Sequence, residues 1–254
     1  MMNRFVNNYS KIVLLGRHRD RINQLVYSTL CINQHKNIKE SYHHKPINYL
    51  SHINYVSTKS VSINESSDGF FKSFIKKVGW LPHNKTKTRL KGYLLYENIA
   101  DQLDYKYWIE ENKLDNNFAS WFIVTELHIW MLLVRCMSDG DHGRLLRNAI
   151  IEAMWSDVSV RAKKLAPGKS SVVRKQVDVL SEQFQAALVG YDEGILSSDM
   201  VLAGAIWRRF FQSKCDDPRL IENIVRYVRK QTLHLESTEL SDNPKISWIP
   251  LKEK

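Results

Sequence analysis

The sequence contains little cysteine. Its 254 residues include only Cys31, Cys136 and Cys215, which lie far apart and form no Cys-x-x-Cys pair. Small secreted domains that rely on disulfides have an even number of cysteines at short, regular spacings. The odd and scattered cysteines therefore argue against a disulfide framework and favour a reducing compartment.

Long apolar runs are also missing. No uninterrupted apolar stretch reaches the roughly 18 residues expected of a membrane-spanning helix. The nearest approach is Phe118–Met137, which is apolar almost all round but contains Glu126, His128 and Arg135. A Glu or Arg near the centre of a helix costs about 2.5–3.5 kcal/mol on membrane-insertion scales. We therefore predict that this segment is the central buried helix of a soluble, all-helical domain.

Catalytic and metal-binding motifs are absent as well. Gly168-Lys169-Ser170 is like the end of a phosphate-binding loop, but Lys163 stands where that motif needs glycine, and no strand precedes it. Residues 69–240 contain no Glu-x-x-His pair for a di-iron site, and no Gly-x-Ser-x-Gly nucleophile motif occurs. His128 shares a helix face with Trp121, which is typical of a hydrogen-bonded core histidine. The residues thus favour a binding protein without cofactor or metal over an enzyme.

Positive charge is abundant. The formal net charge is +10, which favours anionic partners such as ribosomal RNA, a membrane surface or an acidic protein. Alternatively, part of the excess belongs to a removable targeting segment. Residues 1–30 contain five Lys or Arg, one acid (Asp20) and interleaved apolar residues. This composition is typical of a mitochondrial transit peptide, although an ordinary basic helix also fits.

The remaining chain divides by its pattern. Residues 31–68 are polar and without helical period, which predicts a weakly ordered linker. Residues 69–240 show helical periodicity and no alternation of period two, which predicts one all-α domain of about six or seven helices. Residues 241–254, with two prolines, are expected to form an extended tail. The helical segments are expected at 70–78, 94–103, 118–137, 146–166, 173–191 and 199–211, and after Asp217-Pro218, which has an N-cap residue followed by proline. Gly140 is expected to end the central helix, and Gly190 and Gly194 are expected to mark the end of the helix at 173–191.

Two groups of residues are candidates for binding. Arg208, Arg209 and Phe211 lie largely outside the predicted inner face of their helix, and an exposed aromatic beside arginines is typical of protein interfaces. The alternative is that Phe211 turns inward and the arginines are only solvated. A basic stretch is expected to form a solvated loop that could also contact phosphates or lipid headgroups; it comprises Lys85, Lys87, Arg89 and Lys91. The helical tryptophans are expected in the core, or else in a groove for a partner helix; they are Trp121, Trp130, Trp155 and Trp207.

Five segments in this order resemble the ubiquinol–cytochrome c chaperone family, the assembly factor 1 type of respiratory complex III. The resemblance covers about residues 70–235, and its motifs are specific only in combination. The segments are Tyr93–Leu103, Trp121–Gly140 (WFIVTELHIWMLLVRCMSDG), Ala153–Leu165, Phe184–Leu196 and Leu202–Phe211.

This resemblance implies a helical, non-enzymatic assembly chaperone without a cofactor of its own. Family members act in mitochondria, peripherally at the matrix side of the inner membrane. They bind newly made cytochrome b together with a small partner, assembly factor 2, and associate with the mitochondrial ribosome. The residues by themselves leave an alternative, an RNA- or mitoribosome-binding helical module in which Lys85–Lys91 and Arg208–Arg209 contact phosphates.

Overall fold

The computed structural model describes residues 83–240 and 245–251, all within the second of two compact units of the chain, Asn48–Lys254. The described residues are mostly helical and include no strand, which confirms the predicted all-α class. The predicted transit segment 1–30, the linker 31–68 and the helix at 70–78 lie outside them. Seven helices follow one another: α5 (His83–Gln102), α6 (Tyr105–Glu111), α7 (Phe118–Met137), α8 (Gly140–Leu165), α9 (Ser170–Leu196), α10 (Asp199–Arg209) and α11 (Pro218–Glu236).

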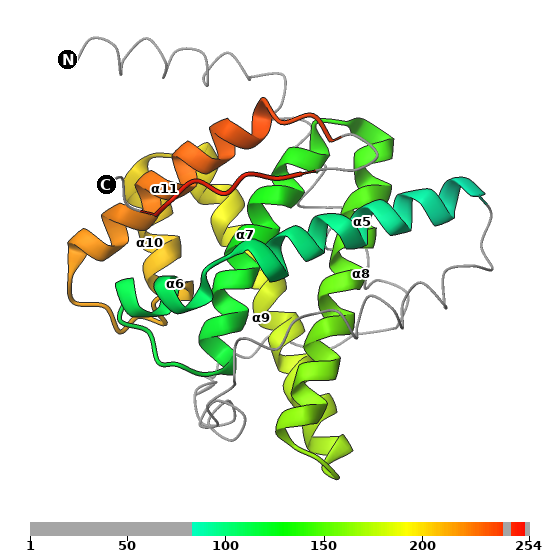
Figure 1. Cartoon of the computed structure of the whole chain (residues 1–254). Helices are drawn as coiled ribbons and strands as arrows, with labels where there is room; N and C mark the ends of the chain where they lie inside the picture. The colour runs from blue at the N-terminus through cyan, green and yellow to red at the C-terminus, as the bar shows by residue number, and fades with distance from the viewer. Residues whose placement is uncertain (1–82, 241–244, 252–254) are drawn as a thin grey trace, which may run out of the picture. The chain divides into compact units, whose positions relative to one another are not determined.

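Helix α7 is the centre of the fold (Figure 1). It contacts α5, α6, α8, α9 and α11, and 17 of its 20 residues are buried. Its length and composition alone would allow it to cross a membrane, but 89% of its most apolar window is buried inside the protein. The helix begins where Asn117 accepts a hydrogen bond from the Ser120 amide at 3.0 Å. The prediction of a central buried helix is therefore confirmed.

The two turns beside α8 depend on glycines in the left-handed region. Gly140, at φ +62°, is the first residue of α8 and follows closely on the end of α7 at Met137, near the point where the sequence predicted that the central helix ends. Gly168, at φ +77°, follows Pro167 in the turn between α8 and α9. Residues with a Cβ rarely adopt this conformation, so the two glycines permit α7, α8 and α9 to follow one another through short turns.

Helix α5 corrects the expectation of a basic loop. It starts at His83 and carries Lys85 to Lys91 in its first turns, whereas the sequence predicted a helix only from about Leu94. The physical reason is packing against α8. A Cβ added to Gly92 would lie 2.4 Å from the Ala149 Cβ, so the two backbones approach unusually closely. This contact stabilises a helical turn whose own sequence is mostly polar.

Other boundaries differ from the sequence pattern for identifiable reasons. The short α6 was not predicted, because seven residues give too little periodicity. Gly194 does not end α9 but lies inside it, where an added Cβ would lie 2.8 Å from the Leu202 Cα of α10. Helix α11 begins as predicted, with the Asp217 carboxylate accepting from the Arg219 amide and Pro218 in the first turn.

Candidate functional site

His128 lies at the centre of a closed aromatic cluster. Its Nδ1 is 2.7 Å from the Val124 carbonyl oxygen and its Nε2 is 2.8 Å from the Tyr227 hydroxyl. Because a carbonyl can only accept, Nδ1 carries the proton and Nε2 accepts from the hydroxyl. Trp108 and Trp248 meet the imidazole edge-on at 4.8 and 4.9 Å. Burial lowers the pKa of His128 to about 4, so the ring is neutral at pH 7 and acts as the predicted core histidine.

A buried ion pair connects α7 to α10. Glu126 has no exposed surface, and both its oxygens accept from Arg209, at 2.7 Å from Nε and 2.5 Å from Nη2. Arg209 also donates to Gln183 of α9 at 3.1 Å. Burial raises the pKa of the Glu126 carboxyl, while the adjacent guanidinium opposes that rise. The pair fixes the position of α10 on the bundle rather than facing a substrate.

A second polar group joins α7, α8 and α9. The Trp130 indole donates to Asp192 at 2.7 Å, and burial raises the pKa of Asp192 to about 6. Two polar atoms in the described residues are buried without a hydrogen-bond partner, namely the Tyr191 hydroxyl oxygen and Arg147 Nε. These groups lie on three helices, and the Tyr191 ring packs against Trp130 at 5.0 Å between centroids.

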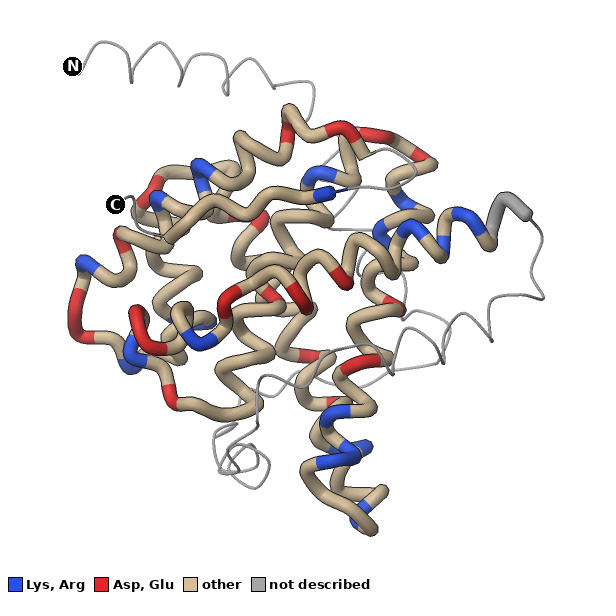
Figure 2. Tube along the Cα trace, viewed as in Figure 1, with Lys and Arg blue, Asp and Glu red and all other residues tan. Residues whose placement is uncertain are grey.

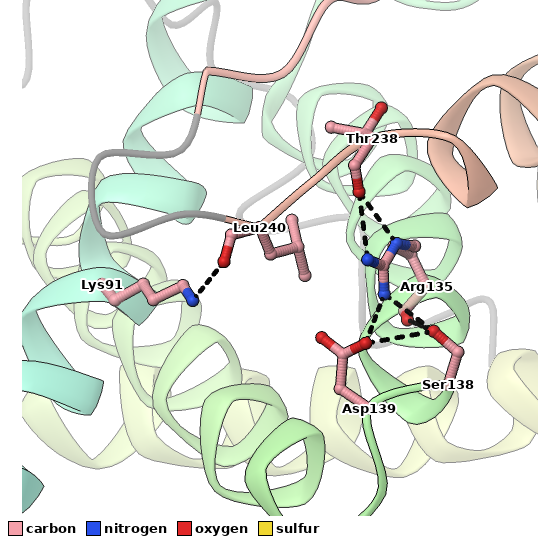
Figure 3. A network of polar contacts seen from close by, with 6 residues as sticks. All are labelled: Lys91, Arg135, Ser138, Asp139, Thr238 and Leu240. Atoms are coloured by element: carbon pink, nitrogen blue, oxygen red, sulfur yellow. Dashed lines mark hydrogen bonds and ion pairs between the residues drawn. The ribbon is translucent and has the colours of Figure 1, made fainter.

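The chain beyond α11 is held across the bundle by two cations. Figure 3 shows Arg135 of α7, whose Nε and Nη2 donate to the Thr238 carbonyl at 3.1 and 3.0 Å. The same guanidinium donates to Ser138 and Asp139 at the end of α7. From α5, the buried Lys91 ammonium donates to the Leu240 carbonyl at 2.5 Å. These contacts position the segment that leads into the chain terminus.

Residues 245–251 form what we term the C-terminal strap, which runs back along α11 and across α7 (Figure 1). Gln231 of α11 donates to the Ser247 carbonyl at 3.2 Å and accepts from the Ile249 amide at 2.9 Å. The Trp248 indole donates to the Asn98 carbonyl of α5 at 3.3 Å. The strap thereby covers the aromatic cluster around His128.

The structure separates the three residues predicted to contact a partner. Arg208 is exposed, Arg209 is bound to Glu126, and Phe211 is only 5% exposed. The expectation of an exposed Phe211 is therefore wrong. The reason is that α10 ends at Arg209 and the chain then turns through Gln212 and Ser213, both with positive φ, so helical spacing does not extend to residue 211. Whether the three residues contribute to partner binding stays a prediction.

A different aromatic occupies the position expected of Phe211. Trp207 is 38% exposed, against the core position expected for the helical tryptophans, whereas Trp121 and Trp130 are buried as predicted. Trp207 lies on one face of α10 with Met200, Ala203 and Gly204, at spacings of three and four residues. We call these four residues the α10 outer face. Met200 is 83% exposed.

The α10 outer face also has an arginine. A Cβ added to Gly204 would lie 3.2 Å from Arg208 Nη1, which places that guanidinium over the glycine. The Trp207 indole donates to the Cys215 carbonyl at 3.1 Å, which fixes the ring while one side stays accessible. Trp, Met and Arg are the residue types enriched at protein interfaces. The spacing of residues 200, 203, 204 and 207 was visible in the sequence and could have identified this face.

The predicted anionic-surface residues are not a uniform patch. Lys87 is exposed, but Arg89 is paired with Glu152 of α8, and Lys91 is buried on the Leu240 carbonyl. Lys85 lies in α5, and its side chain is outside the described part. The sequence missed a stronger concentration of charge around the α8–α9 turn, where six Lys or Arg and no acid occur between residues 158 and 177.

The described residues contain no group of three or more potential metal-binding side chains. An open pocket of about 380 Å³ lies beside the strap and is lined by Gln102, Lys245, Ile246, Ser247 and Trp248. These side chains do not include an acid–base pair.

Comparison with known proteins gives a consistent result. A family model described as ubiquinol-cytochrome C chaperone matches residues 110–242, from the end of α6 to just beyond α11. A Drosophila melanogaster protein, ubiquinol-cytochrome c reductase complex assembly factor 1, is 47% identical over 201 residues, which are 76% of this chain and 78% of that protein. No solved structure matches the chain.

More distant relatives extend the similarity. The Homo sapiens protein of the same description is 36% identical over 196 residues, 75% of this chain and 65% of its own length. The protein CBP3, mitochondrial, of Saccharomyces cerevisiae is 30% identical over 164 residues, 62% of this chain and 48% of its own length. The chain thus spans less than two thirds of these two relatives.

Proposed function

Because the chain belongs to the ubiquinol–cytochrome c chaperone family, we propose that it is an assembly chaperone for mitochondrial respiratory complex III. In this proposal it binds newly made cytochrome b together with a small partner of the assembly factor 2 type. The role is non-enzymatic, and the protein acts peripherally at the matrix side of the inner membrane, near the mitochondrial ribosome. The similarity to complex III assembly factors over three quarters of the chain carries the proposal.

The geometry supports binding of a partner helix at the α10 outer face. A newly made membrane protein or a small helical subunit presents apolar helices, which need a complementary apolar surface before they assemble. Met200, Trp207 and Arg208 offer such a surface, and Leu196 at the end of α9 is 54% exposed. Trp207 is oriented in advance by its bond to Cys215, which reduces the conformational entropy lost on binding.

Arg209 contributes to this surface indirectly. Its ion pair with Glu126 holds α10 on the bundle, so it positions the outer face without pointing out of it. Phe211 likewise belongs to the packing beneath that face, in contact with Phe210 at 5.1 Å between ring centroids. In this proposal the three residues first considered as a binding surface have separate tasks, and among them only Arg208 contacts the partner.

The test is co-purification from mitochondria under mild detergent, with the full chain as bait. The variant Trp207→Ala with Arg208→Ala should retain its helical circular dichroism and lose cytochrome b and the small partner. Truncation of such central interface residues typically costs about 2 kcal/mol or more, which is roughly a 30-fold loss of affinity.

A matched control is the pair Leu145→Ala with Arg144→Ala. It removes an exposed apolar residue and its neighbouring arginine from α8, where Leu145 is 57% exposed. The control should retain both partners. Retention of both partners by the Trp207→Ala with Arg208→Ala variant would place binding elsewhere. Wild-type bait that captures neither cytochrome b nor a complex III subunit would contradict the proposed function.

A further inference from the structure

The end of the α8–α9 hairpin holds much of the protein's positive charge. The segment 158–177 contains six Lys or Arg and no Asp or Glu, in a chain whose net charge is +10. Figure 2 shows basic residues gathered where this hairpin projects away from the other helices. Five of the six are exposed, and we call them the basic tip: Lys163, Lys164, Lys169, Arg174 and Lys175.

The sixth residue, Arg161, has a structural task and is not part of the tip. It binds Asp157 of its own helix at 2.9 Å, and its guanidinium lies 4.5 Å from the Trp121 ring centre. The other five lie beyond it, on either side of the turn that is closed by a 3.2 Å bond from the Lys169 amide to the Ala166 carbonyl. The hairpin therefore concentrates charge at its end rather than along its length.

The cations at the start of α9 go against the usual preference of a helix N-terminus for acids. Lys163 and Lys164 occupy the last turn of α8, where cations favourably oppose the helix dipole. The same argument predicts acids at the start of α9. Instead its first turn has no acid, Lys169 stands at the N-cap without a side-chain capping bond, and Arg174 and Lys175 follow. Cations are unfavourable at that helix end, and a departure from a local rule is typical of a functional site.

The residues between the cations distinguish two kinds of anionic partner. Val160 is 40% exposed, Leu165 and Val172 are half-buried, and Pro167 is exposed at the turn. No aromatic residue or histidine occurs between residues 156 and 183, although RNA-binding surfaces commonly stack bases on such side chains. Four of the five tip cations are lysines, which act as flexible point charges rather than the planar forks that arginine offers to nucleic acids. Cations interleaved with small apolar side chains fit the headgroup region of a bilayer.

We propose that the basic tip is the site at which this protein contacts an anionic phospholipid surface. This proposal adds a contact site to the peripheral membrane role proposed above. It rests on that proposed function only for the statement that the membrane is the mitochondrial inner membrane. In this arrangement the hairpin end meets the headgroups, and the α10 outer face lies on another part of the bundle and stays available to a protein partner.

The experiment measures sedimentation of the purified full chain with lipid vesicles. Vesicles of phosphatidylcholine with about one third phosphatidylglycerol provide the anionic surface, and pure phosphatidylcholine is the neutral reference. A basic residue close to an anionic surface contributes about fivefold in binding, so Lys163→Gln, Lys164→Gln and Lys169→Gln together should weaken it about 100-fold. Binding of the wild-type chain should also fall steeply between about 0.05 and 0.5 M salt.

The matched control removes three lysines elsewhere, Lys106→Gln, Lys113→Gln and Lys214→Gln, all of them exposed. It has the same net charge as the tip variant and should bind vesicles nearly as well as the wild type. Helical circular dichroism is measured for both variants, because unfolding would mimic loss of binding.

Three outcomes would overturn the proposal. The first is a wild-type chain that fails to bind anionic vesicles at low salt, and the second is equal weakening of vesicle binding by both triple variants. The third is a tip variant that loses binding to a structured RNA while its vesicle binding is unchanged.

The proposed function is judged separately by complex III content in cells that carry the tip variant. If the tip variant loses vesicle binding but the cells keep a normal complex III content, the tip is a lipid site that assembly does not require. Normal vesicle binding in a chain that captures no complex III subunit would leave the lipid site and contradict the function.

Discussion

The buried Glu126–Arg209 pair gives a quantitative prediction about what holds α10 in place. Replacing one member leaves the other charge in the interior, which costs about 3–5 kcal/mol, whereas replacing both with apolar residues is often close to neutral. The two single variants should differ. Arg209 retains 17% exposure of its side chain and a bond to Gln183, whereas Glu126 has no exposure at all. Arg209→Met should therefore destabilise the protein more than Glu126→Leu.

Lowering the pH should reduce the loss of unfolding free energy caused by Arg209→Met, but not the loss caused by Glu126→Leu. Without the guanidinium, burial favours the neutral carboxyl of Glu126, so lowering the pH supplies the proton that removes the buried charge. The assay is urea unfolding of the two single variants and the double variant at pH 7 and pH 5, followed by circular dichroism. The coupling energy from this cycle should exceed about 2 kcal/mol, and the double variant should be more stable than Arg209→Met. Additive losses, within about 0.5 kcal/mol, would show that the pair is not coupled and would refute the reasoning.

Four further substitutions test the interior. The wild type should lose about 3 kcal/mol of stability as the pH falls from about 6.5 to 4, because the pKa of His128 is about 4 in the folded protein and about 6.5 in the unfolded chain, which therefore takes up the proton first. His128→Gln should remove this loss, as measured by urea unfolding across that pH range. Asp192 has the opposite pH dependence, because its folded pKa of about 6 lies above the ordinary 3.8 and the wild type therefore loses stability as the pH rises from about 4 to 6. Asp192→Asn should be about 2–3 kcal/mol more stable than the wild type at pH 7 and no more stable below pH 4, as measured by urea unfolding. Trp130→Ala should cost about 3–5 kcal/mol in unfolding free energy, because the ring is 1% exposed, and a loss under about 0.5 kcal/mol would contradict its core position. Gly92→Ala should lower the melting temperature by several degrees, since a Cβ at 2.4 Å from the Ala149 Cβ must separate α5 from α8, and an unchanged melting curve would contradict that close approach.

The sequence predicted the elements whose cause is local. Helix α7 is apolar almost all round, and that property follows from composition, as does burial of Trp121 and Trp130. The start of α11 was predictable because Asp217 and Pro218 act within one turn. Gly140 was recognised for the same reason, since its positive φ is a property of the residue itself.

Features that depend on distant partners were not predictable from periodicity. The bond between Arg209 and Glu126 joins residues 83 positions apart, and nothing near Arg209 indicates which acid it meets. The first turns of α5 are helical because α8 approaches Gly92, which no local pattern records. Phe211 was assigned to the wrong face because a helical projection was continued past the end of α10. The basic tip, in contrast, was visible as an acid-free segment and needed only the hairpin to give it a location.

The C-terminal strap has a consequence for the order in which the protein folds during synthesis. Trp248 closes the aromatic cluster beside His128 and bonds to Asn98, a residue made 150 positions earlier. A ribosome adds about 5–20 residues per second, so α5 waits several seconds or more for the tryptophan that covers it. Until residues 245–251 leave the exit tunnel, Trp248 cannot cover the aromatic cluster. Translation itself therefore sets the earliest moment at which this domain can be complete, and a chain that ends before Trp248 would keep the aromatic cluster uncovered permanently.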